Sequence, residues 1–225
     1  MKHILHNPVF NALCSGDKPL SLGTDAVKFF DEQVSPFVGF DDNYTKRFND
    51  LHELFPQGRK ILYANPVTIT TPKGWQVLVE INGLQFVYEG GVIKNEFANV
   101  QPLSKMHIDE MVDLATLTKP GPFGKRTIDF GYYHGIFENE KLVAMTGQRL
   151  HPKNYTEISA VCTHPDHTGK GYANALMQHQ LQLIQQQGQQ PFLHVREDNE
   201  RAIALYQRLG LTISRPMNFY FMKRQ

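Results

Sequence analysis

The stretch CTHPDHTGKGYANAL, residues 162–176, holds the residues of this chain best suited to bind an anion. Gly169 and Gly171 stand directly before a segment expected to form a helix, and Lys170 lies between them. The first N–H groups of a helix lack partners within the helix and lie at the positive end of its dipole, so they can bind a phosphate. The two glycines would let such a ligand approach the backbone closely. The sequence therefore predicts a phosphate-binding turn, and a plain strand-to-helix loop is the simpler alternative.

Two other interpretations of this stretch fit the residues less well. A P-loop of the form GxxxxGK[ST] would need a glycine where His164 stands. A zinc site could use thiol, imidazole and carboxylate ligands. The residues of these types are Cys162, His164, Asp166 and His167. Pro165 bends the chain between the histidines, and no second ligand pair follows at zinc-finger spacing, so we expect no metal here.

The second half of the sequence alternates between helical and extended patterns. Leu176, Met177, Leu181 and Ile184 follow helical spacing after the glycine turn. The predicted order is a helix over 107–117, a Pro/Gly-rich loop over 119–127, a hairpin over 131–150 that turns at 138–140, a strand over 156–163, a helix over 172–187 that is broken at Gly188, a strand over 191–198, a helix over 199–210 and a strand over 218–224. This order predicts a mixed α/β sheet with the glycine turn in its middle.

The first half shows strand and helix patterns but no recognisable site. Strands are predicted over 61–70 and 75–89, and the second is expected to break at Asn82-Gly83, a favoured hairpin turn. Phe48, Leu51 and Leu54 are spaced like one face of a helix within 44–55. Gly90-Gly91 and the polar residues 94–99 suggest a boundary near residue 97. We therefore divide the chain into an N-terminal α/β segment, 1–97, and a C-terminal domain, 98–225.

Composition excludes several classes of protein. The chain has 225 residues, 41% of them hydrophobic and 20% charged, with a net charge of +1, so nothing favours nucleic-acid or membrane-surface binding. Its two cysteines, Cys14 and Cys162, form no disulfide framework and fit a reducing compartment. The first ten residues contain no apolar run long enough for a signal peptide, and no later stretch could span a bilayer. We expect a cytoplasmic protein.

Two motifs resemble those of the GNAT superfamily of N-acetyltransferases. TGKGYA, residues 168–173, resembles the acetyl-CoA-binding motif [Q/R]-x-x-G-x-[G/A], with Thr168 in the place of the usual Gln or Arg. NERAIALYQRLGL resembles N-x-x-A-x-x-x-Y-x-x-x-G-[FL], and the matching residues are Asn199, Ala202, Tyr206, Gly210 and Leu211. The resemblance covers about residues 98–225 and is strongest to the branch with the C-terminal domain of glycine N-acyltransferases. It implies a GNAT-like, mostly antiparallel, splayed sheet flanked by helices, with an N-terminal α/β extension.

The resemblance implies acetyl-CoA as the co-substrate. Its pantetheine arm would lie between two splayed strands, and its pyrophosphate would lie on the backbone amides of 169–174. The implied acetyl-CoA-binding residues are Val161, Cys162, Thr163, Thr168, Gly169, Lys170, Gly171, Tyr172, Ala173, Asn174 and Asn199. Asn199 is also expected to cap its helix. Strand alternation places the Cys162 side chain opposite those of Val161 and Thr163, which argues against an acyl-cysteine intermediate.

Two catalytic residues follow from the same resemblance. Tyr206 matches the tyrosine that protonates the departing thiolate, although a core aromatic on an amphipathic helix would show the same spacing. Glu157, fourteen residues before Gly171, is similar to the general-base glutamate of histone-acetylating members, and alternation places it on the face of Val161 and Thr163. A surface carboxylate, with water as the base, is the alternative. On the next strand, His194, Arg196 and Asp198 could line an acceptor cleft or be solvated.

These observations predict an acyl-CoA-dependent N-acetyltransferase that transfers the acetyl group directly to an amine, without a metal. The expected partners are acetyl-CoA and an amine acceptor, which could be a small molecule, a protein N-terminus or a lysine; a homodimer is a further possibility, and no nucleic acid or membrane is expected. Acceptor specificity should lie in loops such as 119–131. The alternatives are a non-catalytic acyl-CoA sensor and an interaction protein whose N-terminal part mediates assembly.

Overall fold

The computed structural model describes residues 3–95, 97 and 99–225. Within them an 11-stranded sheet has the order β1-β2-β3-β4-β11-β5-β10-β9-β8-β7-β6. The strands are β1 Leu22–Gly23, β2 Val27–Phe29, β3 Phe37–Phe40, β4 Lys60–Asn65, β5 Trp75–Tyr88, β6 Gln101–Pro102, β7 His134–Glu138, β8 Lys141–Gln148, β9 Tyr155–Thr163, β10 Gln190–Arg196 and β11 Leu211–Arg224. The α-helices are α1 Pro8–Leu13, α2 Arg47–Leu54, α3 Ile108–Thr118, α4 Tyr172–Gln186 and α5 Glu200–Arg208.

The sheet is mixed and mostly antiparallel, which confirms the predicted fold class. β9 and β10 are parallel, as are β3 and β4, and the other paired strands are antiparallel. β5 lies between β10 and β11, so a strand from the first part of the chain stands in the centre of the sheet. The boundary predicted near residue 97 falls where residues 96 and 98 lie outside the described part of the chain.

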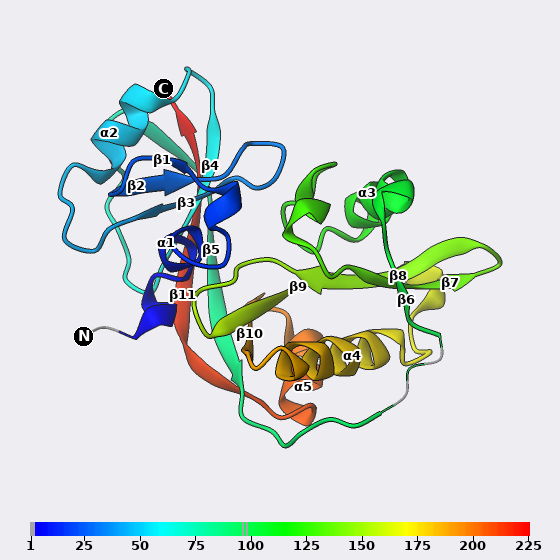
Figure 1. Cartoon of the computed structure of the whole chain (residues 1–225). Coiled ribbons are helices and arrows are strands. Elements are labelled where there is room, and N and C mark those ends of the chain that lie inside the picture. The colour runs from blue at the N-terminus through cyan, green and yellow to red at the C-terminus, as the bar shows by residue number, and fades with distance from the viewer. Residues whose placement is uncertain (1–2, 96, 98) are drawn as a thin grey trace.

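Helices cover both faces of the sheet (Figure 1). α4 and α5 lie on one face, where Met177, Leu181 and Tyr206 pack against Phe86 and Leu193 of the strands. α3 lies on the opposite face (Figure 1), and its residues Met111 and Leu114 join a second cluster with Met145 of β8. Burying each such large apolar side chain contributes roughly 1.5–3 kcal/mol. The two apolar clusters therefore hold β8, β9 and β10 firmly from both sides.

Most elements expected from the sequence are present. The apolar residues predicted to form the inner face of α4 are all buried. The β7–β8 hairpin turns at Asn139 and Glu140, both with positive φ, as tight hairpins require. Gly188 has a φ of +70° just beyond the end of α4. In the described part of the chain, no helix is both long and apolar enough to cross a membrane.

The hairpin turn predicted at Asn82-Gly83 is wrong. β5 runs straight through both residues, and Asn82 pairs with Asn218 and Gly83 with Met217 on β11. Continuous pairing with a long neighbouring strand overrides the local turn preference of the dipeptide. A Cβ at Gly83 would lie 2.9 Å from the Phe219 ring and 2.9 Å from the Val195 carbonyl oxygen. The glycine is thus required for close packing within the sheet.

Candidate functional site

The glycine turn forms a cradle of free backbone amides at the start of α4. β9 ends at Thr163, a single 3-10 turn, Pro165–His167, follows, and the helix begins at Tyr172. Gly169 and Gly171 have φ values of +82° and +80°, a backbone conformation that other residues rarely adopt. Among the described residues, none accepts a hydrogen bond from the backbone N–H groups of 169–174. The cradle therefore has the geometry that a pyrophosphate needs.

A cavity of about 420 Å³ opens at this cradle, between the end of β9, the start of α4 and α5. We call it the α4 cavity. The residues predicted to bind acetyl-CoA line it, with one exception: Val161, Cys162, Thr163, Thr168, Gly169, Gly171, Tyr172, Ala173, Asn174 and Asn199. A Cβ at Gly169 or Gly171 would meet no atom within 4 Å, so open space lies above the turn. The structure thus brings these residues around one space, and their contacts with acetyl-CoA stay a prediction.

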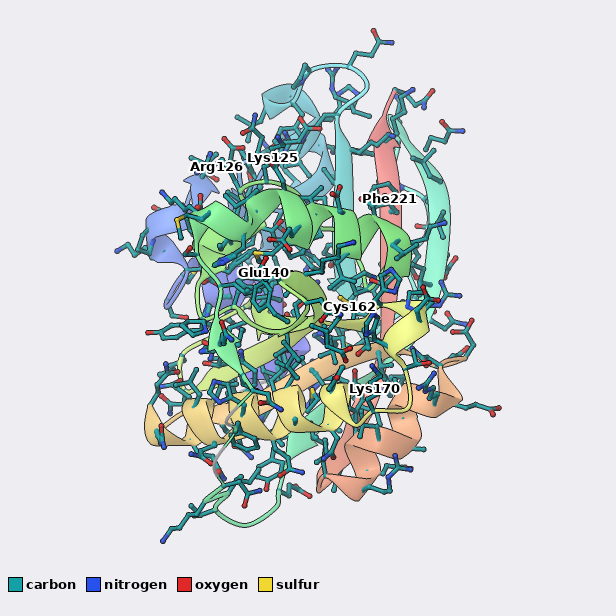
Figure 2. All side chains as sticks on the ribbon, turned by 90° about the vertical axis from the view of Figure 1, so that its right-hand side faces the viewer. Lys125, Arg126, Glu140, Cys162, Lys170 and Phe221 are labelled. Atoms are coloured by element: carbon teal, nitrogen blue, oxygen red, sulfur yellow. The ribbon has the colours of Figure 1, made fainter. Side chains whose placement is uncertain are left out.

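The exception is Lys170. Its Nζ donates hydrogen bonds of 2.8 and 2.9 Å to the two carboxylate oxygens of Glu138, at the end of β7. Glu138 also accepts a hydrogen bond from the Tyr172 hydroxyl and lies 3.2 Å from His167 Nδ1. The Lys170 and Tyr172 hydrogen bonds lower the pKa of Glu138 to about 2. Lys170, labelled in Figure 2 near the start of α4, is thus engaged by a carboxylate outside the α4 cavity.

A second cavity, of about 210 Å³, adjoins the first where β9 and β10 diverge. We call it the β10 cavity. The two strands pair only at one end, where Tyr155 to Glu157 face Gln190 to Phe192, and beyond that point they separate. Val161, Asn199 and Tyr206 line both cavities, so a ligand in the α4 cavity could reach into the β10 cavity there. The divergence is the splay that a pantetheine arm between the strands would require.

Tyr206 of α5 stands at the junction of the two cavities. Its ring packs edge-on against Phe86, and 7% of its surface is exposed. Burial raises the pKa of the hydroxyl to about 12, and no described residue hydrogen-bonds to it. The hydroxyl therefore keeps its proton at neutral pH. Asn199, whose side chain accepts a 3.2 Å hydrogen bond from the Ala202 N–H, is the helix cap that was predicted.

A bulge in β9 changes which side chains share a face. Ala160 has a φ of +54°, and the register with β8 shifts so that Gly147 faces Ser159 but Met145 faces Cys162. Val161 consequently packs with the α4–α5 cluster, whereas Cys162 packs with the α3 cluster. Strict alternation had placed Glu157 on the face of Val161 and Thr163, and this expectation is wrong. The predicted opposition of Cys162 to Val161 is confirmed.

Glu157 is fully buried, which excludes the surface carboxylate considered as an alternative. It accepts hydrogen bonds from Arg149 Nε at 2.8 Å and Nη2 at 2.6 Å, and its Oε1 lies 2.7 Å from His194 Nδ1. Although burial opposes ionisation, Arg149 and His194 together lower the pKa of Glu157 to about 2. Glu157 does not line either cavity. It is an ionised partner of Arg149 and His194.

Gln85 of β5 determines the tautomer of His194. One end of the Gln85 side-chain amide lies 2.9 Å from the Leu5 carbonyl oxygen, which only accepts hydrogen bonds, so this end must be the amide nitrogen. The same nitrogen lies 3.0 Å from His194 Nε2. An amide nitrogen only donates, so His194 Nε2 accepts and Nδ1 carries the hydrogen that faces Glu157. His194 is thereby occupied at both ring nitrogens. His194 and Arg196 line the β10 cavity, whereas Asp198 pairs with Arg196 through hydrogen bonds of 2.9 and 2.7 Å.

Among the residues described, the structure gives Cys162 no nucleophilic role and His164 and Asp166 no metal-binding role. Cys162, labelled in Figure 2, is buried on the side of α3, and burial raises the pKa of its thiol to about 11. A thiol that stays protonated on that face is poorly placed to act as a nucleophile. His164 Nδ1 lies 3.8 Å from Asp166, and within the described chain no group of three or more His, Cys, Asp and Glu side chains could hold a metal.

Sequence reasoning missed Arg149, Gln85 and the contribution of the N-terminal segment. Arg149 follows the end of β8, and its guanidinium lies 4.8 Å above the Phe37 ring. Phe37, Leu62 and Ile81 come from the segment in which no site had been recognised, yet they line the β10 cavity. Long-range strand pairing brings them there, and no local motif marks them. Lys119, Pro120 and Pro122, from the loop expected to govern acceptor specificity, also line this cavity.

Comparisons with known proteins agree with this architecture. Residues 133–219 match the family described as FR47-like protein. A crystal structure from Novosphingobium aromaticivorans DSM 12444, assigned to the GNAT family of acetyltransferases, is 28% identical over 100% of both chains, with a TM-score of 0.93. A GCN5-related N-acetyltransferase from Kribbella flavida is 13% identical, with 96% of this chain and 95% of that chain covered and a TM-score of 0.63. None of the curated proteins matches the chain.

The matches support a class of protein by similarity. The fold is that of GNAT acetyltransferases, and the family match together with the full-length structural match supports an acetyltransferase of the GNAT superfamily. The Kribbella structure, at 13% identity, supports the fold alone. The nearer resemblance to glycine N-acyltransferases is not confirmed by these matches and stays a prediction.

Proposed function

We propose that the protein is an acyl-CoA-dependent N-acetyltransferase that moves an acetyl group from acetyl-CoA directly to an amine. One observation carries the proposal: a single cavity is lined by all the residues predicted for acetyl-CoA binding except Lys170, and it joins a second cavity at Tyr206. A cradle for the donor, an acid at the junction and a space for the acceptor are the three parts that such a transfer needs.

The residues of the α4 cavity fit acetyl-CoA. The free amides of 169–174 would bind its pyrophosphate at the positive end of α4. The pantetheine arm would extend between β9 and β10 and hydrogen-bond to the backbone near Val161 and Thr163. The Thr163 hydroxyl, buried and without a partner in the described residues, is available to the same ligand. Asn199 lies beside this path.

Transfer forms a bond between the amine nitrogen and the thioester carbonyl carbon, and it breaks the bond from that carbon to sulfur. The bulge leaves Ala160 and Val161 without partners in the β8 register, so we assign the Val161 N–H as the donor to the oxyanion. The Tyr206 hydroxyl gives its proton to the departing thiolate and regains one from solvent. The hydroxyl is protonated at neutral pH, so it still carries its proton when the thiolate forms.

The amine must lose a proton, and the geometry favours water as the acceptor of that proton over Glu157. A general base works best with a pKa near the operating pH, whereas the pKa of Glu157 is lowered to about 2 and its carboxylate faces Arg149 and His194. We therefore keep water as the proposed base and assign Glu157 a structural role in positioning its two partners.

Two measurements test the proposed function. Acetyl-CoA at a concentration well above its Kd should raise the Tm, because a ligand that binds only the folded state stabilises it. Incubation with acetyl-CoA and a panel of amines should release CoA thiol. A raised Tm without thiol release from any amine would favour the non-catalytic acyl-CoA sensor, and no change in Tm would refute the cradle. The cytoplasmic location, the homodimer and the division at residue 97 stay proposals.

A further inference from the structure

The lining of the β10 cavity selects among amine acceptors. We propose that the acceptor is a small amine that carries a carboxylate and an apolar body, and that Arg149 binds the carboxylate. This inference rests on the proposed acetyl transfer, because it names the chemical class of the acceptor for that reaction.

Some N–H donors of Arg149 make no hydrogen bond within the described residues. Glu157 accepts from Nε and from one hydrogen of Nη2, and no described residue accepts from Nη1. Nη1 is not fully buried, and Arg149 lines the β10 cavity. The Nη1 and Nη2 end of the guanidinium is therefore available to a ligand in this cavity. Two parallel N–H donors match the two oxygens of a carboxylate.

The charges around the cavity favour an anionic acceptor. Lys119, Arg149 and Arg196 line it, and no Asp or Glu does so among the described residues. Glu157 and Asp198 pair with the two arginines from outside the lining, so Lys119 is the lining cation that has no carboxylate partner among the described residues. A polyamine or a strongly cationic peptide would find no carboxylate there to pair with its charge. The unpaired Lys119 also lowers the pKa of a bound ammonium group, so it favours the neutral amine that attacks the thioester. This effect reduces the need for a dedicated base.

The apolar part of the lining and the volume restrict the acceptor further. Phe37, Leu62, Ile81 and Phe219 form the apolar part of the lining, and the Phe37 ring lies 4.8 Å from the Arg149 guanidinium. The cavity volume, about 210 Å³, is below the roughly 300–1,000 Å³ typical of pockets for drug-sized ligands. A free amino acid with an aliphatic or aromatic side chain fits these conditions. A protein N-terminus fits them poorly, since its first residue has no free carboxylate.

Glu157 and Phe37 position Arg149 for this contact. The two hydrogen bonds to Glu157 fix the plane of the guanidinium, and the Phe37 ring, 4.8 Å away, supports one face of it. A guanidinium held in this way loses little conformational entropy when it binds a carboxylate. Glu157 is thus a positioning residue that acts through Arg149.

The test compares acceptors that differ only in the carboxylate. CoA release from acetyl-CoA is measured with glycine, leucine and phenylalanine and with their amides, glycinamide, leucinamide and phenylalaninamide. The unchanged protein should use the leucine or phenylalanine acid about 10–100-fold better in kcat/KM than the matching amide, as expected for hydrogen bonds to a charged group. In Arg149→Lys, which keeps the charge but loses the fork, KM for the acids should rise and most of this preference should disappear.

Arg59→Lys is the matched control. Arg59 also pairs with a glutamate, Glu32, and lies 5.0 Å from a Phe55 ring, and its side chain is 12% exposed against 13% for Arg149. It lines neither cavity, so the preference for acids should persist in this variant.

Each other outcome decides a different point. Equal use of acids and amides, a preference for amides, or no reaction of any acid despite a Tm raised by acetyl-CoA would overturn the inference. A preference that survives in a folded Arg149→Lys protein would overturn the assignment to Arg149. No Tm response to acetyl-CoA would instead refute the proposed function itself. If Arg149→Lys does not fold, the comparison of acids with amides in the unchanged protein still decides whether a carboxylate is recognised.

Discussion

Replacing Glu157 by glutamine should destabilise the protein in a pH-dependent way. Burial alone would raise the pKa of this carboxylate, but Arg149 and His194 outweigh burial and lower it to about 2, from an ordinary value of 4.5. A difference of this size corresponds to about 3 kcal/mol in the free energy of unfolding. Because the folded-state pKa is the lower one, the stabilisation is present above about pH 4.5 and is lost as the pH falls toward 2. Glutamine cannot supply it, and it leaves the Arg149 charge unpaired in the interior.

Urea unfolding of both proteins at several pH values measures this effect. At pH 7 the Glu157→Gln protein should be less stable by about 3–5 kcal/mol, the usual cost of breaking a buried ion pair. The difference should narrow as the pH is lowered from about 4.5 toward 2. Removing both partners in Arg149→Met/Glu157→Gln should cost less than the single change, since no buried charge is left alone. Glu32→Gln, which breaks an ion pair whose carboxylate side is 64% exposed, should cost no more than about 1 kcal/mol.

Two results would refute the reasoning on stability. One is a Glu157→Gln protein within about 1 kcal/mol of the unchanged protein at pH 7. The other is a stability difference that stays constant down to pH 2.

The same variant separates a positioning role from a base role. If Glu157 positions Arg149, Glu157→Gln should raise KM for a carboxylate-bearing acceptor and leave the acidic limb of the pH–rate profile in place. If Glu157 were the base, kcat would fall about 10²-fold or more and the acidic limb would change. Acetyl-CoA binding, followed by its effect on Tm, serves as the check that the variant is folded.

Three further substitutions test the proposed site. Tyr206→Phe keeps the ring and loses no hydrogen bond within the described protein, so the free energy of unfolding should change by less than about 1 kcal/mol. The single-turnover rate should fall roughly 10²–10⁴-fold, because the thiolate loses its proton donor. A wild-type rate in a folded variant would reduce Tyr206 to a packing residue. Gly171→Val should abolish the Tm rise with acetyl-CoA, and Gly188→Val, at a φ of +70° and equally open space beyond the other end of α4, should keep it. If both lose the rise, backbone strain and not the cradle is responsible. Lys170→Met should weaken acetyl-CoA binding less than about threefold, because the Lys170 charge is already paired with Glu138. A tenfold loss of affinity, measured by calorimetry, would show that Lys170 turns toward the ligand.

The parts of the site that the sequence predicted are local in the chain. The cradle needs glycines at two left-handed positions directly before a helix, and these appear as neighbours in the sequence. Asn199 caps the short helix that carries Tyr206, so their spacing alone places them together. Such features depend on the backbone conformation of a few neighbouring residues, and this conformation can be predicted from the residue types.

What the sequence did not predict depends on contacts between distant strands. The environment of Glu157 is formed by Arg149 just after β8, by His194 on β10 and, through His194, by Gln85 on β5. The bulge at Ala160 arises in pairing with β8, and nothing in the residues around it indicates a positive φ. Asn82-Gly83 shows the opposite failure, because a strong local turn preference yields to pairing along β11. Alternation rules work until one extra residue enters a strand.

The position of β11 has a consequence for how the protein is synthesised. β11, the last strand of the chain, lies between β4 and β5, which leave the ribosome much earlier. Until its residues emerge, the nascent chain carries two strands with unpaired edges, the arrangement most prone to aggregate. The wall of the β10 cavity is also incomplete until then, because Phe219 belongs to β11. We therefore expect ribosome-bound chains stalled before this strand to be sensitive to protease and unable to bind the acceptor, and released chains to gain resistance and binding together.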